Sequence, residues 1–265
     1  MRLLVRTWNV FHGRTVPETR SLRLEEMIRL VTAGEPDLVC LQEVPVWALG
    51  RLSAWSGMSA VGAVAMPPLG GPLGRRLSDL EPRLLRAALC GQGNAVLVRR
   101  GLRIEERRRV VLNPLRFRRT EARRLRLSRR AELVWGLNRR VAQLVRVGTL
   151  GRSLLAVNVH LTADPDHRLA EAELRAVLAL VDEARGAADS VLLCGDLNLE
   201  AERSALLRDL PARGFSAPGP GIDHVLARGL ELVREPALWP EERRRRGRFL
   251  LSDHAPVEGE AMIRP

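Results

Sequence analysis

Acids, amides and imidazoles, the side chains that bind metals and transfer protons, recur at the ends of apolar segments along this chain. They are Asn9 after LLVRTW, Glu43 after LVCLQ, His160 after LLAVNV, Asp196 and Asn198 after VLLCG, Asp223 in IDHVL, and Asp253 and His254 before APVEG. A single acid at the end of a strand is usually a cap or a turn residue. Because burying a carboxylate is costly unless it is paired or binds a cation, a set spread over the whole chain indicates one shared site at a sheet edge.

The composition of this set indicates which chemistry it could perform. Oxygen donors dominate it, and hard ligands of this kind suit Mg²⁺ or Mn²⁺ rather than zinc. The oxygen donors are Glu43, Asp196, Asn198, Asp253 and the amide of Asn9. The imidazoles of His160 and His254 can transfer protons or bind an anionic oxygen near neutral pH. Carboxylates, a hard metal and imidazoles together predict hydrolysis of a phosphate ester.

Hydrophobic periodicity predicts the strands and helices that must position these residues. Strands are expected at Leu3–Val10, Pro36–Val44, Asn94–Arg99, Arg140–Val147, Leu154–Leu161, Ser190–Cys194, Ile222–Ala227 and Leu230–Glu235, with a last strand after His254. Helices are expected at Leu22–Ala33, where Ser21 is the predicted cap, at Arg168–Arg185, and in a short form near Glu202–Leu210. The longer helices each show one apolar stripe, which predicts that they cover a sheet.

Two segments have a less regular pattern. Val64–Gly93 is rich in Pro and Gly and then amphipathic over Leu77–Leu89, so we predict a surface loop followed by a helix. Arg103–Arg130 is dense in arginine with alternating apolar residues, which predicts strands interrupted by a basic loop. Since no repeat or low-complexity linker divides the chain, a single domain over residues 1–265 is predicted, with a basic insertion around residues 103–130.

The ordered series T-W-N-V, L-Q-E-V, N-V-H-L, G-D-L-N, I-D-H and S-D-H-A-P-V resembles the endonuclease/exonuclease/phosphatase superfamily. This group includes pancreatic-type deoxyribonuclease, abasic-site endonucleases, inositol-polyphosphate phosphatases and bacterial sphingomyelinases. Each motif alone is a weak signal, whereas six in the right order are a strong one. The resemblance extends from Trp8 to Val257. It implies an α/β fold, a four-layer α/β sandwich in which two mixed β-sheets pack face to face and are flanked by helices.

The resemblance also implies which residues hold the metal. Glu43 would be the main ligand, and Asn9 would support the metal or the phosphate. Asn198 would hold the phosphate or the metal, and Asp253 would be a ligand or lie directly behind one. Asp196 would belong to the same metal set and would also orient or deprotonate the attacking water. The implied cofactor is Mg²⁺ or Mn²⁺.

The remaining roles concern the phosphate and the leaving group. His254 would contact the scissile phosphate, and Asp223 would fix and charge its ring. His160 would stabilise or protonate the leaving oxygen. Abasic-site endonucleases usually have a tyrosine at this place, and this chain contains no tyrosine. A histidine at this position resembles the deoxyribonuclease, sphingomyelinase and phosphatase branches instead. The choice among these branches stays open. Many relatives also have an acid shortly after the first asparagine, where this chain has Val-Phe-His.

Three further residues are predicted to bind substrate. His12 follows the first strand and could contact phosphate or lie on a surface loop. Asn94 and Arg140 resemble family positions near the site, although Arg139 could serve as well as Arg140. For His224 a structural role is favoured, because alternation along a strand points it away from Asp223.

Asp164, Asp166 and His167 follow the strand that ends at His160. They could contribute to a substrate loop. Capping of the helix predicted at Arg168–Arg185 is favoured, because acids at this place satisfy the free amide groups of a first turn.

The charge of the chain constrains its partners. It has 43 positive and 31 negative residues, which gives a net charge of +12. All 43 positive residues are arginine, because the sequence contains no lysine. Arginine binds carboxylate and phosphate in a bidentate fork, so the surplus favours a polyanionic partner. A GC-rich genome would also replace lysine with arginine, and both explanations stay open. Arg243–Arg248 is a second basic run, expected on a loop near the site.

These observations leave three hypotheses about function. The first is a metal-dependent phosphodiesterase of the nuclease type that acts on DNA or RNA. The second is a phosphatase or phosphodiesterase for a small or lipid-linked phosphate, and the third is a nucleic-acid-binding protein with an inactive site. We expect a cytoplasmic protein without stable membrane insertion, since Cys40 and Cys194 lie in apolar runs and no signal peptide or spanning segment is recognisable. Protein partners are not predicted.

Overall fold

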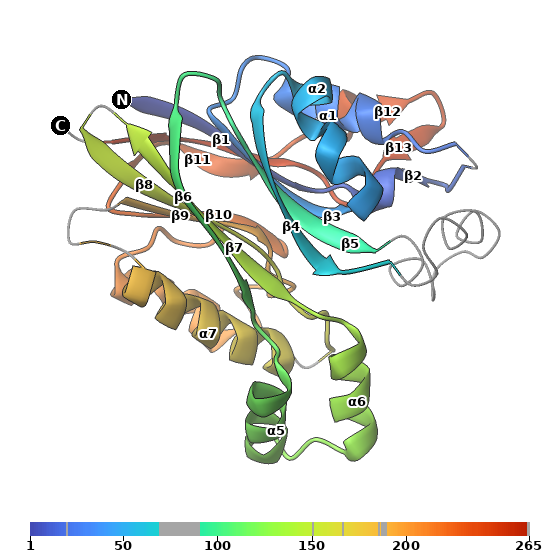
Figure 1. The fold of residues 1–265 in the computed structure, drawn as a ribbon, viewed down its shortest axis with the longest axis vertical. Helices are drawn as coiled ribbons and strands as arrows, with labels where there is room; N and C mark the ends of the chain where they lie inside the picture. The colour runs from blue at the N-terminus through green and yellow to red at the C-terminus, as the bar shows by residue number, and fades with distance from the viewer. Residues whose placement is uncertain are drawn as a thin grey trace.

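Two mixed β-sheets packed face to face form the centre of the structure, a computed structural model (Figure 1). It describes residues 1–19, 21–68, 91–149, 151–165, 167–184, 186 and 190–263. The first sheet has the order β11 (Glu231–Leu238), β14 (Val257–Met262), β1 (Arg2–Asn9), β3 (Leu38–Val44), β5 (Gln92–Val98) and β4 (Ser59–Met66). The second has the order β10 (Asp223–Arg228), β9 (Ser190–Asp196), β8 (Arg152–His160), β7 (Val141–Thr149) and β6 (Arg103–Val111).

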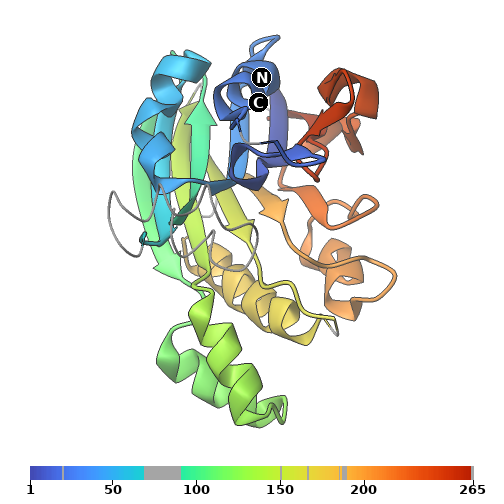
Figure 2. The same ribbon diagram turned by 90° about the vertical axis from the view of Figure 1, so that its right-hand side faces the viewer.

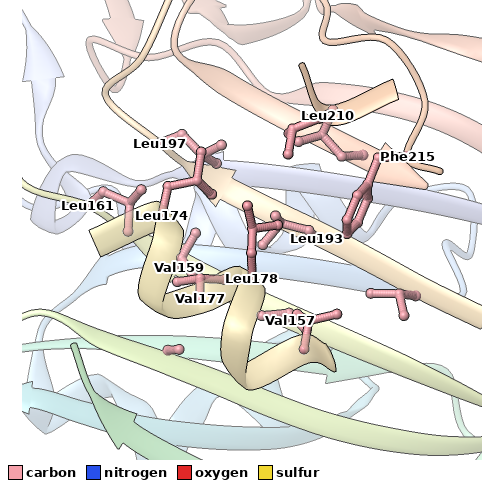
Figure 3. Packing of buried hydrophobic residues seen from close by; sticks show 14 of the residues in the cluster. Val157, Val159, Leu161, Leu174, Val177, Leu178, Leu193, Leu197, Leu210 and Phe215 are labelled. Atoms are coloured by element: carbon pink, nitrogen blue, oxygen red, sulfur yellow. The ribbon is translucent and has the colours of Figure 1, made fainter. Parts of the chain in front are cut away.

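Helices cover the outer faces of both sheets. On the first sheet, α1 (Leu24–Thr32) and α2 (Leu52–Ser56) pack their apolar side chains around Trp8. On the second, α7 (Arg168–Ala184) buries Leu174, Val177 and Leu178 against the strands (Figure 3). A separate apolar layer fills the space between the sheets. The arrangement is the four-layer α/β sandwich that the sequence predicts.

The shorter elements lie in the connections. They are η1 (Phe11–Gly13), β2 (Thr15–Val16), η2 (Val46–Arg51), α8 (Ala205–Arg208), η3 (Leu210–Arg213), α9 (Glu241–Arg244), β12 (Arg245–Arg246) and β13 (Phe249–Leu251). Strands β12, β13 and β2 form a small third sheet beside the first one. In the described part of the chain, no helix is both long enough and apolar enough to cross a lipid bilayer.

The basic segment differs from its prediction in its second half. Its first part is strand β6, but helix α5 (Leu115–Arg124) follows where strands interrupted by a basic loop were expected, and helix α6 (Arg129–Leu137) begins at its end. Arginine, leucine, alanine and glutamate favour helix, and the Ser128 hydroxyl caps α6 by accepting from the Ala131 amide at 3.2 Å. The buried Trp135 ring packs edge-on against Phe117. The two helices form a hairpin that projects from the sheets (Figures 1 and 2).

Helix ends were predicted with mixed success. The prediction of a Ser21 cap was wrong, because α1 begins at Leu24 with Arg23 at the cap position and no capping side chain. Asp164 does cap α7, since its carboxylate accepts from the amides of Leu169 and Ala170, each at 3.3 Å. The helix predicted at Leu77–Leu89 lies outside the described residues.

The close approach of β8 and β9 depends on Gly195. These strands run parallel, with Val159 opposite Gly195 and His160 opposite Asp196. Gly195 has φ of +138°, and a Cβ atom there would lie 1.9 Å from the Val159 carbonyl oxygen. A backbone position of this kind accepts glycine alone.

Gly195→Ala is therefore expected to lower the free energy of unfolding by more than about 3 kcal/mol, because the strands must separate to admit the methyl group. Thermal and urea unfolding would measure this change. Gly50→Ala is the matched control, since a Cβ atom at Gly50 meets nothing within 4 Å. Equal stability of the two variants would contradict the argument.

Candidate active site

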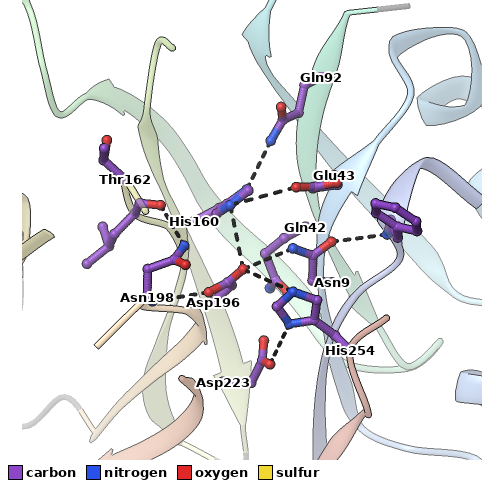
Figure 4. A network of polar contacts seen from close by, with 12 residues as sticks. Asn9, Gln42, Glu43, Gln92, His160, Thr162, Asp196, Asn198, Asp223 and His254 are labelled. Carbon is purple, nitrogen blue, oxygen red and sulfur yellow. Dashed lines mark hydrogen bonds and ion pairs between the residues drawn. The ribbon is translucent and has the colours of Figure 1, made fainter. Parts of the chain in front are cut away.

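The ends of two pairs of parallel strands meet at one edge of the sandwich. β1 and β3 of the first sheet end at Asn9 and near Glu43, while β8 and β9 of the second sheet end at His160 and Asp196. Asp223 at the start of β10 pairs in register with Asp196. Residues far apart in sequence thus surround one small volume between the sheets (Figure 4).

Asp196 lies at the centre of this volume and is almost completely buried, with 2% of its surface exposed. Its Oδ2 accepts from Asn9 Nδ2 at 2.9 Å, and its Oδ1 accepts from the Asn198 amide at 3.1 Å. His160 Nε2 and His254 Nε2 lie 3.6 and 3.9 Å from Oδ2. Burial, and then the negative charge of Asp223, raise the pKa of Asp196 to about 7.

Asp223 and His254 form a charged pair. The distance between Asp223 Oδ2 and His254 Nδ1 is 2.7 Å. Burial favours the neutral imidazole, but the hydrogen bond and the charge of Asp223 outweigh it and raise the pKa of His254 to about 10. Trp8 Nε1 donates to the His254 carbonyl at 2.9 Å, which fixes the backbone of this residue. His254 is therefore a cation at neutral pH, with Nε2 directed toward Asp196.

Glu43 faces the same volume from the first sheet. Its two carboxylate oxygens lie 3.3 Å from His12 Nε2 and 3.9 Å from His160 Nε2. The side chain is 20% exposed, so the carboxylate borders the opening of the site. Asp253 is exposed, and its carboxylate is 3.4 Å from the Ser252 hydroxyl. The structure thus brings Glu43, His12 and His160 together, with Asp253 on the outer side.

His160 is held as a neutral imidazole. Burial lowers its pKa well below the usual value, and the positive charges of Arg140, His254 and His12 act in the same direction. Gln92 Nε2 lies 2.9 Å from His160 Nδ1. Because an amide nitrogen can only donate, Nδ1 accepts and the ring proton is on Nε2. That proton points toward the carboxylates of Asp196 and Glu43.

This donor set fits a divalent cation. Asp196, Asp223 and His254 offer ligand atoms that all lie within 4.8 Å of one another. We favour Glu43 and Asp196 over that trio, because the bond between Asp223 and His254 already uses the facing atoms of both. The raised pKa of Asp196 shows that the described residues do not fully compensate its buried charge. A cation beside it would do so.

Asn94 and Arg140, which the sequence predicts as substrate residues, lie in different surroundings. Asn94 is 1% exposed, and its amide donates across the sheets to the Val141 carbonyl at 3.4 Å. Arg140 lies close enough for its charge to affect His160, and its buried Nε has no hydrogen-bond partner among the described residues. The structure therefore places Arg140 beside the site and Asn94 between the sheets. His224 points away from Asp223, as predicted, and its Nε2 lies 3.0 Å from the Leu199 carbonyl.

The second basic run supports the site from behind. Arg244 is buried, and its guanidinium donates to the carbonyls of Leu251 and Ser252 at 3.2 and 2.8 Å. Arg243 stacks on the Trp239 ring at 3.5 Å. Arg244 therefore holds the segment that leads to His254. The run forms α9 and β12 rather than the predicted loop, and Arg243, Arg245 and Arg248 are exposed.

Comparison with known proteins identifies the family. The sequence matches the Endonuclease/Exonuclease/phosphatase family over residues 7–254. This chain belongs to that family. Proteins of the family are typically hydrolases of phosphoester bonds, and they generally use a divalent metal. No protein among the curated sequences matches this family member.

Solved structures share its fold at low sequence identity. An endonuclease/exonuclease/phosphatase from Beutenbergia cavernae is 18% identical with a TM-score of 0.67, covering 98% of this chain and 71% of that one. A family protein from Bacteroides thetaiotaomicron is 12% identical with a TM-score of 0.68, covering 100% and 99%. TDP2 from Caenorhabditis elegans is 18% identical with a TM-score of 0.63, covering 99% and 75%.

Three residues that support the site of this family member were missed from the sequence. Gln92 lies two residues before Asn94 on the same strand, so alternation would have placed it on the same face. The Ser252 hydroxyl donates to the Asn9 carbonyl at 2.7 Å and accepts from the His254 amide. Glu173 is a fully buried acid on the apolar stripe of α7, and that position was itself a signal.

The pairing of Asp223 with His254 predicts an imidazole that stays protonated above neutral pH in the metal-free protein. Asp223→Asn is expected to lower the midpoint of the His254 titration by about two pH units, because the negative charge that is hydrogen-bonded to the ring is lost. NMR titration of the ring resonances would measure it. The matched control is Asp209→Asn, an exposed acid on another element, which should leave the midpoint unchanged. An unshifted midpoint in Asp223→Asn would refute the assignment.

Proposed function

We propose that this chain hydrolyses phosphate diesters with Mg²⁺ or Mn²⁺, and that nucleic acid is its substrate. One observation carries the proposal: a cationic His254 and two carboxylates, Asp196 and Glu43, face one volume from opposite sheets. A phosphodiester needs both kinds of group, because its oxygens are anionic and its attacking water must lose a proton.

The groups of the chain divide this work. Asp196 accepts the proton of the attacking water. The imidazolium of His254 binds a phosphoryl oxygen and stabilises the charge of the transition state, while Asp223 keeps the ring charged and oriented. His160 presents its Nε2 proton to the leaving oxygen. Asn198 fixes Asp196 through its amide, and its side chain donates to the Leu161 carbonyl.

The metal would be held by Glu43 and Asp196, with Asn9, Asn198 and Asp253 as further oxygen donors around it. When bound, it would offset the negative charge of the phosphoryl oxygens and lower the pKa of a bound water. Asn9 already has its Nδ2 committed to Asp196, and its Oδ1 accepts from the Phe11 amide at 3.0 Å. Its carboxamide is thus rigid. His12 beside Glu43 and Arg140 beside His160 would bind outer phosphate oxygens.

The substrate assignment rests on charge. A surplus of +12 that consists of arginine alone favours a polyanion over a small neutral ester. A phosphatase or phosphodiesterase for a lipid-linked phosphate is the second candidate, and the exposed leucines of the α5–α6 hairpin favour it. An inactive binding protein would have no need of the paired carboxylates and charged imidazole. The reduced, buried thiols of Cys40 and Cys194 support action in the cytoplasm.

Glu43→Gln and Asp196→Asn are expected to lower kcat/KM on a bis-aryl phosphodiester by at least about 100-fold each, because each removes a charge that the transition state needs. A chelator should abolish turnover, and added Mg²⁺ or Mn²⁺ should restore it. Glu235→Gln, an exposed acid on β11, is the matched control and should retain full activity. Chelator-resistant turnover would rule out the metal assignment.

The substrate class is tested by a panel of plasmid, single-stranded DNA, RNA, a soluble bis-aryl phosphodiester and a phosphodiester in lipid vesicles. Nucleic acid cleavage is expected, with kcat/KM that falls steeply as salt is raised, because bound counterions are released when phosphates are neutralised. His254→Ala, assayed in parallel, should lack all activity. Cleavage of the lipid ester without nucleic acid cleavage would establish the second candidate instead.

A further inference from the structure

The hairpin of α5 and α6 exposes an unusual amount of aliphatic surface. Leu115, Leu133, Val134 and Leu137 are 51%, 71%, 52% and 72% exposed. They make up half of the large apolar side chains that are exposed in the described part of the chain. Single exposed leucines are ordinary, but a group of them on one projecting element marks an interaction surface.

The same hairpin is strongly cationic. Between residues 115 and 137 it has eight arginines and two glutamates, a net charge of +6. Arg118 bonds to the Asn113 carbonyl and Arg124 pairs with Glu121. The other six have no acid partner within the described ranges. They are Arg116, Arg119, Arg123, Arg126, Arg129 and Arg130.

Arginines and two of these leucines meet in one cleft. A cleft of about 500 Å³ between the two helices is lined by both kinds of side chain. Its lining residues are Leu115, Arg118, Arg119, Arg123, Arg129, Glu132 and Leu133. A ligand in this cleft would meet guanidinium groups and apolar carbon together, which is the chemistry of a phosphate attached to a hydrocarbon chain.

We infer that the α5–α6 hairpin docks on an anionic phospholipid surface. Its arginines would bind lipid phosphates, and its leucines would enter the boundary between headgroups and acyl chains. A second copy of this chain is disfavoured, because two faces of net charge +6 repel. Nucleic acid would use the arginines but not the aliphatic side chains. The two aromatic rings of the hairpin, Trp135 and Phe117, pack edge-on against each other, and the buried Trp135 ring cannot stack on a base.

The hairpin adjoins the active site, so docking would determine which way the site faces. Helix α6 ends at Leu137, three residues before Arg140 beside His160. Trp135 Nε1 donates to Glu173 Oε1 at 2.7 Å, and Glu173 also accepts from the Thr162 amide, two residues after His160. The inference depends on the hairpin alone and holds for either substrate class.

Vesicle co-sedimentation in chelator tests the inference without catalysis. The full chain is expected to bind vesicles of phosphatidylcholine mixed with anionic phosphatidylglycerol. It is not expected to bind vesicles of phosphatidylcholine alone. Arg119→Gln with Arg123→Gln should weaken binding about 30-fold, because each cation near the surface contributes about 1 kcal/mol. Leu133→Ser with Leu137→Ser should weaken it about tenfold or more, because apolar area no longer enters the membrane.

The controls make equivalent changes elsewhere. Arg100→Gln with Arg213→Gln removes two exposed charges, and Leu22→Ser with Leu238→Ser removes two exposed leucines, all outside the hairpin. Both double variants should bind vesicles like the parent chain. Absence of vesicle binding, or equal losses in hairpin and control variants, would overturn the inference. Hairpin-dependent retention of duplex DNA or RNA without vesicle binding would overturn it in favour of a nucleic-acid surface.

Discussion

Negative charge buried at the seam of two sheets is the constraint on which the rest of the structure depends. Asp196 and Asp223 lie in register on neighbouring strands, and both are more than nine-tenths buried. Two adjacent buried carboxylates are unstable unless cations and hydrogen-bond donors compensate them. Here the compensation comes from the opposite sheet, through Asn9 and His254. The two sheets must therefore meet in one alignment for the site to exist.

Buried amides behind the site maintain that alignment. Gln42 Nε2 donates to Asn158 Oδ1 across the sheets at 2.8 Å, and Asn158 Nδ2 lies 3.0 Å from the carbonyls of both Leu41 and Ala95. Gln42 and Asn158 are completely buried. Hydrophobic burial is non-directional, whereas a buried amide that loses its partner lowers the free energy of unfolding by about 1–3 kcal/mol. The hydrogen bond between Gln42 and Asn158 therefore favours one relative position of the two sheets over others with similar hydrophobic burial.

Sequence reasoning predicted most of the strands, although not β4, and it predicted polar residues that the structure brings together, because both depend on local patterns. A polar residue after an apolar run identified Asn9, His160 and Asp196, and parallel pairing brought them together. The supporting residues were harder to predict. Gln92 and Ser252 act through partners more than 60 positions away, and no local pattern shows such partners.

The helices of the α5–α6 hairpin could not be predicted from local patterns. In Arg103–Arg130 the alternation that predicts β6 continues weakly into α5, so periodicity alone could not separate strand from helix. Tertiary contacts decide it. Asn113 closes the base of the hairpin by donating to the carbonyls of Trp135 and Asn138 and by accepting from the Arg140 amide. A helix pair anchored in this way is favoured over two short strands at the edge of a sheet.

The buried carboxylate of Glu173 connects the hairpin to the catalytic edge. Glu173 is fully buried, and burial raises its pKa even though Trp135 and Thr162 both donate to it. A buried acid whose hydrogen bonds are satisfied in this way favours one local geometry. The geometry specified is the position of α6 relative to the segment that follows His160. Because Trp135 of α6 and Thr162 of this segment both donate to the Glu173 carboxylate of α7, these hydrogen bonds link the hairpin to the catalytic edge.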